Sequence, residues 1–120
     1  MKTPGPDHPI RIEPVTGRVV VRYQGVVVAD SRDALKLTEA SYPPVLYIPR
    51  ADALLEYYAH TDHHTHCPYK GDASYYTLSA AGKDAANSVW SYEEPYPAVE
   101  QIRNHLAFYV SQVAIETVEA

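Results

Sequence analysis

Hydrophobic and polar residues alternate along several short stretches of the chain, which is the two-residue period of a β-strand. The clearest strand signal does not alternate: residues 18–23 and 26–29 are two valine-rich runs separated by Gln24-Gly25. β-Branched residues favour strands, and glycine tolerates a positive φ, so we expect a hairpin with a two-residue turn here.

Alternation predicts three more strands, and a short apolar run predicts a fourth. They are expected at residues 35–39, 45–48, 73–78 and 87–92. Pro43-Pro44 forces an extended entry to the second of these, and Pro49 ends it. Residues 50–58 carry a helix signal, because Asp52 can cap a run of good helix formers.

The C-terminal part allows two interpretations. Residues 98–112 could form one amphipathic helix, but β-branched and aromatic residues favour strands. We therefore expect one helical turn at residues 97–103 and strands at residues 105–110 and 113–118. Residues 1–18 are a proline-rich, extended lead-in, and residues 19–120 form a single, mainly antiparallel β domain with one or two short helices.

Composition narrows the class of protein. The chain has 120 residues, 46% hydrophobic and 21% charged, as expected of one soluble globular domain. A net charge of −5 argues against nucleic-acid binding. A single cysteine fits a reducing compartment, and no apolar run resembles a signal peptide or a membrane span. We expect a cytoplasmic monomer or weak homodimer with no membrane partner.

Residues 60–76 hold the densest chemistry of the chain. They contain four of its six histidines, its only cysteine, Lys70-Gly71 and three tyrosines. Imidazole and thiolate bind transition metals, but the ligands come from one segment and no second cysteine exists to close a tetrahedral site. Solvated loop histidines are the alternative that we favour, with no structural metal and no cofactor.

Cys67 allows a catalytic and a structural interpretation. A nearby cation such as Lys70 would raise its thiolate fraction and make it a nucleophile, with Glu39 or a neighbouring histidine for proton transfer. A small buried apolar cysteine is the alternative.

Lys70 and Arg50 are candidate contacts for an anionic ligand. Tyr69-Lys70-Gly71 is the type of turn at which a lysine charge meets an anion and glycine allows close approach. Ordinary salt bridges with Glu39 or Asp52 are as compatible with the sequence.

The order of several motifs resembles domain-of-unknown-function family 427 over about residues 19–118. The motifs are Ala29-Asp30-Ser31, Leu35-x-Leu37-x-Glu39, Tyr42-Pro43-Pro44-Val45-x-Tyr47-Ile48-Pro49-Arg50, Cys67-Pro68-Tyr69-Lys70-Gly71-x-Ala73-x-Tyr75-Tyr76, Trp90-x-Tyr92-x-x-Pro95 and Ala107-Phe108-Tyr109. The resemblance implies a β-tent-like fold, in which two antiparallel sheets are pinned at one edge with a cleft between them. Similar folds carry two zinc-binding cysteine pairs, which this chain lacks.

Two functions follow from these observations. The first is a binding module for a small polar or anionic metabolite. Its expected contacts are Arg50, Tyr69, Lys70, Tyr75, Trp90 and Tyr92. The second is a cysteine-dependent or nucleotide-processing enzyme that uses Cys67 with Glu39 or a nearby histidine. In either case we expect Glu39, Arg50, Cys67 and Lys70 to converge on one concavity, because polar groups beside apolar strands are costly to bury unpaired.

Overall fold

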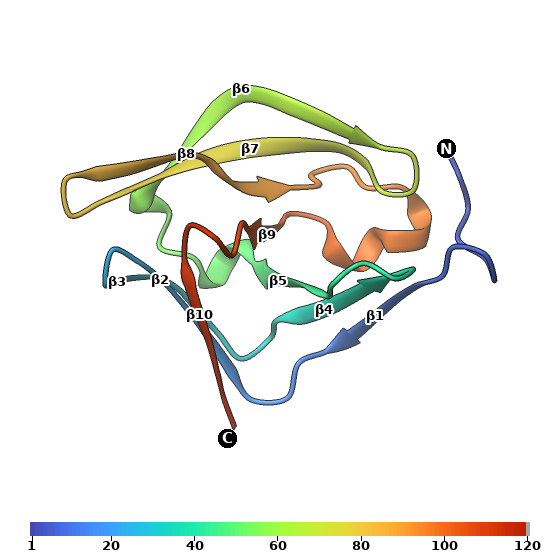
Figure 1. Ribbon diagram of the computed structural model, residues 1–120, viewed down its shortest axis with the longest axis horizontal. Coiled ribbons are helices and arrows are strands. Elements are labelled where there is room, and N and C mark those ends of the chain that lie inside the picture. Colours follow the sequence, from blue (N-terminus) through green and yellow to red (C-terminus); the bar gives the residue numbers. More distant parts are fainter. Residues whose placement is uncertain (120) are drawn as a thin grey trace.

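The computed structural model describes residues 1–119, and most of its regular structure is antiparallel strand (Figure 1). The elements are β1 (Ile10–Pro14), β2 (Arg18–Tyr23), β3 (Val26–Ser31), β4 (Leu35–Glu39), β5 (Val45–Pro49), η1 (Arg50–Asp52), η2 (Leu55–Tyr57), β6 (Tyr58–Cys67), β7 (Gly71–Ala80), β8 (Lys83–Ser91), η3 (Pro97–Ile102), β9 (His105–Phe108) and β10 (Ala114–Val118). The prediction of a mainly β domain with two antiparallel sheets is confirmed.

The larger sheet has seven strands in the order β1-β4-β5-β9-β8-β7-β6, and the smaller sheet has three in the order β10-β2-β3. Strand β9 joins two halves of the larger sheet. It pairs with β5 through Leu106 and His105 and with β8 through Phe108 and Ala107. Figure 1 shows β6, β7 and β8 on one side and β1, β4 and β5 on the other, with η3 at one end.

Alternation along the strands divides the core between the two faces of the large sheet. Ile48 belongs to the cluster in which the small sheet packs against the large one, together with Val19, Leu78 and Leu106. Its neighbour Tyr47 belongs to the second cluster, which fills the space between the two halves. Adjacent residues of β5 therefore supply both clusters, as the two-residue period requires.

The predicted hairpin is formed by β2 and β3. Gln24 and Gly25 have φ values of 52° and 78°, the two positive values that a type I′ turn needs. The β7–β8 hairpin turns in the same way at Ala81 and Gly82, with φ values of 52° and 75°.

Two of the remaining elements differ from their predictions. The expected helix at residues 50–58 is wrong: the chain forms two single 3-10 turns, because Ala53 bridges Ala29 and the Leu54 amide donates to the Val28 carbonyl at 2.9 Å. Within the predicted lead-in, β1 pairs along β4 and forms one edge of the large sheet.

The C-terminal helical turn and both strands are present, but β9 and β10 lie in different sheets. The histidine-rich segment forms β6, an irregular strand at the other edge of the large sheet, with a register shift between His60 and His64. Among the residues that the structure describes, no helix has the length and apolar character needed to cross a membrane.

Candidate functional site

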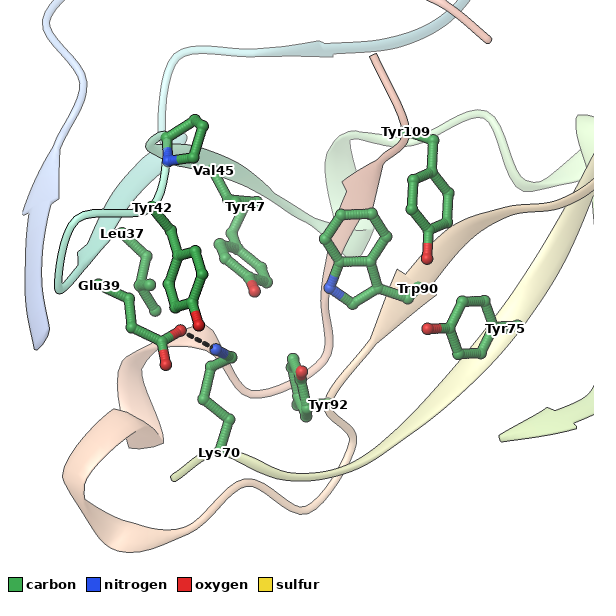
Figure 2. A pocket seen from close by; sticks show the side chains of 11 residues that line it. Leu37, Glu39, Tyr42, Val45, Tyr47, Lys70, Tyr75, Trp90, Tyr92 and Tyr109 are labelled. Atoms are coloured by element: carbon green, nitrogen blue, oxygen red, sulfur yellow. Dashed lines mark hydrogen bonds and ion pairs between the residues drawn. The ribbon is translucent and has the colours of Figure 1, made fainter. Parts of the chain in front are cut away.

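A cavity of about 300 Å³ lies between the two halves of the large sheet (Figure 2). Its lining is mostly aromatic and includes five of the eleven tyrosines of the chain. The lining residues are Leu37, Glu39, Tyr42, Pro43, Val45, Tyr47, Lys70, Tyr75, Trp90, Tyr92 and Tyr109.

The strands supply these side chains through the two-residue period. Leu37 and Glu39 come from one face of β4, and Val45 and Tyr47 come from one face of β5. On the opposite half, Tyr75 of β7 pairs with Trp90 of β8. The cavity is therefore a consequence of strand alternation in two halves that face each other.

A buried ion pair closes one end of the cavity. Lys70 Nζ donates to Glu39 Oε1, and the two side chains are only 11% and 12% exposed. The second carboxylate oxygen of Glu39 lies 2.7 Å from His8 Nε2. Lys70 Nζ also lies 5.9 Å from the centre of the Tyr92 ring, within the range of a cation–π contact.

Two opposing effects act on the pKa of Glu39. Burial disfavours the charged carboxylate and by itself raises the pKa. The hydrogen bonds to Lys70 and His8, and then their charges, lower the pKa and together prevail. The pKa of Glu39 therefore lies below its ordinary value of 4.5, and the side chain is ionised at neutral pH.

The polar ends of the aromatic residues point into the cavity. Figure 2 shows the hydroxyls of Tyr47 and Tyr92 and the indole nitrogen of Trp90 directed toward its interior. Burial raises the pKa of Tyr47 and of Tyr92 well above the ordinary value of 10.0. Both phenols are thus neutral at physiological pH and can donate or accept a hydrogen bond.

A second cavity, of about 350 Å³, lies on the other side of the ion pair. It is lined by His8, Glu39, Tyr42, His66, Cys67, Pro68, Tyr69 and Lys70. Tyr69 stacks on His8, with ring centres 3.9 Å apart and an interplanar angle of 5°. Cys67 is half-buried, and the nearby His66 is paired with Asp72 at 2.7 Å.

Of the predicted site residues, Glu39, Lys70, Tyr75, Trp90 and Tyr92 line the first cavity. Cys67 and Tyr69 line the second cavity, which shares Glu39 and Lys70 with the first.

Arg50 does not join them, and its expected convergence with Lys70 is wrong. Its guanidinium group lies 3.4 Å from both Ser91 Oγ and Glu93 Oε2 and 5.2 Å from the centre of the Tyr76 ring. Ser91 alternates with Trp90 along β8, so Arg50 lies on the face of the sheet opposite to the cavity.

The histidines of residues 60–66 are spread along the outer edge of the sheet, where all four are exposed. Among residues 1–119, no three His, Cys, Asp or Glu side chains are grouped so that they could hold a metal ion.

Four aromatic contacts were not predicted from the sequence: His8, Tyr42, Tyr47 and Tyr109. The excess of tyrosine over phenylalanine is the signal that could have found the last three, since a phenolic ring suits a cavity wall with a polar end. His8 gives no such signal, because it meets Glu39 across 31 positions of sequence.

In a comparison with protein-family models, the family described as "Domain of unknown function (DUF427)" matches residues 11–119. No curated protein matches the chain.

Proposed function

The chain belongs to the DUF427 family, and for this member we propose that the cavity between the two halves of the large sheet binds a small polar molecule with a flat ring. The observation that carries the proposal is the set of polar groups around one space, from three buried residues and the partly buried Trp90. They are the hydroxyls of Tyr47 and Tyr92, the indole N–H of Trp90 and the ammonium group of Lys70.

The size and the walls of the cavity support a ligand with one ring. A volume of about 300 Å³ is at the lower end of the range for small-molecule sites. Tyr75, Trp90 and Tyr109 provide flat surfaces, and aromatic rings prefer offset or edge-to-face contacts with other rings. A polar ring would thus contact the walls with its faces and the hydroxyls with its edge.

The charge of the site supports a neutral or singly charged ligand. The cavity lining contains one cation, Lys70, and one anion, Glu39, and the two are already paired. With Arg50 on the opposite face, no second cation is available in this lining for a multiply charged anion. A ligand that offers both a donor and an acceptor can meet the pair without leaving either charge unpaired.

A proton-transfer role for Glu39 is not part of this proposal. A general base is most effective when its pKa lies near the working pH. The pKa of Glu39 is lowered, and its two oxygens are engaged by Lys70 and His8. The carboxylate is better suited to orienting Lys70 than to accepting a proton from a substrate.

The single tryptophan makes a direct test possible, because Trp90 is both the only indole of the chain and part of the cavity wall. Benzamide, benzoate and benzylamine have one ring each and differ in charge. We expect benzamide to change Trp90 fluorescence in a saturable manner and to bind more tightly than the other two. The absence of a saturable signal for all three compounds at millimolar concentration would contradict the proposal.

A pair of phenylalanine variants tests whether benzamide binds in the cavity. Tyr47→Phe removes one hydroxyl from the cavity and should weaken benzamide binding about threefold to tenfold, as expected for one hydrogen bond. Tyr57→Phe makes the same chemical change in η2, outside the cavity lining, and should leave the dissociation constant unchanged.

A further inference from the structure

A third hollow opens beside the cavity, and we refer to it as the apolar groove. It has a volume of about 460 Å³. Its lining residues are Tyr42, Pro43, Pro44, Val45, Leu46, Trp90, Tyr109, Val110 and Ile115. This lining contains no charged side chain, whereas the cavity beside it contains Glu39 and Lys70.

The apolar groove and the cavity share a wall. Tyr42, Pro43, Val45, Trp90 and Tyr109 line both spaces. The rings of Trp90 and Tyr109 lie 4.8 Å apart and form the aromatic part of this wall. The two hollows are thus neighbours on either side of this wall, and Lys70 lines the polar one while Val110 lines the apolar one.

The apolar groove exposes large hydrophobic side chains. Val110 is 76% exposed, Tyr42 62% and Tyr109 44%. Adjacent exposed hydrophobic residues mark a place where apolar surface is covered on binding, whereas single exposed hydrophobic residues are ordinary. Whatever covers this apolar surface must also be compatible with the polar cavity directly beside it.

We propose that the ligand is amphiphilic: its polar ring occupies the cavity, and an apolar chain of a few carbon atoms lies in the apolar groove. This inference rests on the proposed function and adds the chemical class of the ligand. A chain attached to the ring passes the shared wall of Trp90 and Tyr109 and reaches Val110 without crossing a charged group. One molecule then occupies both the cavity and the apolar groove.

The size of the apolar groove favours this occupant over a second protein molecule. Nine residues line it, whereas a specific protein interface uses about 20–30 residues on each side. A short alkyl chain, in contrast, is covered by a lining of this extent.

The test is a homologous series of compounds: benzamide and its methyl, ethyl, propyl and butyl derivatives at ring position 3 or 4. Burying one methylene group contributes about 0.8 kcal/mol, which corresponds to a gain of about threefold to fourfold in affinity. We expect a rise of this size per carbon in at least one of the two series, measured by Trp90 fluorescence. A flat response in both series, with benzamide itself bound, overturns the inference and leaves the proposed function standing. Failure of benzamide, benzoate and benzylamine alike to bind removes both.

Two matched variants test where the alkyl chain of the ligand lies. Val110→Asp places a charge in the apolar groove and should remove the dependence of affinity on chain length. Leu54→Asp makes a comparable change at another exposed hydrophobic residue, outside the apolar groove, and should leave the dependence intact. A dependence that persists in Val110→Asp overturns the inference. So does a dimer, detected by sedimentation, that Val110→Asp dissociates, because it assigns the apolar groove to a second copy.

Discussion

At the scale of single residues, Glu39 is the most constrained polar group of the site. It lies between Lys70 and His8, with 12% of its side chain exposed. Removing one partner of a buried ion pair leaves the other charge uncompensated, which costs more than the pair contributes when complete. Replacing both partners together avoids that cost.

We therefore predict that Glu39→Gln lowers the free energy of unfolding by about 2–4 kcal/mol at pH 7. Because the folded-state pKa of Glu39 lies below 4.5, its stabilising effect is complete above that value and is lost as the pH falls through the folded-state pKa. The variant should consequently show a shallower loss of stability in acid than the original chain. Urea unfolding at a series of pH values between about 3 and 7 measures both effects.

Two further variants serve as controls for this prediction. Glu100→Gln alters a carboxylate that is 57% exposed beside Arg103, and it should change stability by less than about 0.5 kcal/mol. Glu39→Gln combined with Lys70→Met should recover much of the loss. A double variant that is less stable than Glu39→Gln alone would contradict the explanation.

The sequence predicted part of this site because its motifs mark strand ends and turns. Glu39 ends a strand and Lys70 lies in a turn, and both were expected at one concavity. Arg50 was expected there as well, but its position depends on which face of β8 lies next to it, and that is a property of the packed sheet. The contact of His8 with Glu39 is likewise visible only after β1 pairs with β4.

At the scale of elements, local patterns predicted the strands well and failed where distant backbone took part. The β2–β3 hairpin follows from the valine runs and from Gln24-Gly25 alone. Residues 50–58 have the composition of a short helix, but pairing of Ala53 with Ala29 of β3 stops it from forming. Helix propensity amounts to a few tenths of a kcal/mol per residue, so a tertiary backbone contact overrides it.

Gly17 provides a test of how the elements fit together. It has φ +95°, and a Cβ built on it overlaps the carbonyl oxygen of Val118 at the end of β10. We predict that Gly17→Ala lowers the free energy of unfolding by about 2–4 kcal/mol, because backbone strain and this overlap act together. Urea unfolding gives the change in stability.

Gly25→Ala separates the two causes. Gly25 also has a positive φ, +78°, but a Cβ there meets nothing within 4 Å. In Gly25→Ala, the decrease in the free energy of unfolding should come from backbone strain alone and amount to about 1–2 kcal/mol. Equal losses in the two variants would show that the contact with Val118 contributes nothing.

At the scale of the whole molecule, β9 determines how the two halves of the large sheet are held. It has two registered pairs with β5 and two with β8, and Leu106 is fully buried in the cluster shared with the small sheet. The cavity lies between the halves that this short strand joins. Packing around Leu106 thus stabilises the architecture on which the site depends.

We predict that Leu106→Ala lowers the free energy of unfolding by about 2–5 kcal/mol, because it leaves a hole in a fully buried position. Leu54→Ala deletes the same atoms from a side chain that is 46% exposed and should change the free energy of unfolding by less than about 1 kcal/mol. The midpoint of urea unfolding at an unchanged slope measures both values. Similar losses in the two variants would contradict the role given to β9.

The pairing of β10 with β2 has a consequence for the order of folding. Arg22 of β2 meets Glu116 of β10 across 94 positions of sequence, so loop closure delays this contact relative to the hairpin that β2 makes with β3. During synthesis, the backbone edge of β2 that pairs with β10 stays unpaired until residues 114–118 have emerged. The nascent chain therefore has an open strand edge during most of its synthesis, and this is the kind of surface that chaperones cover.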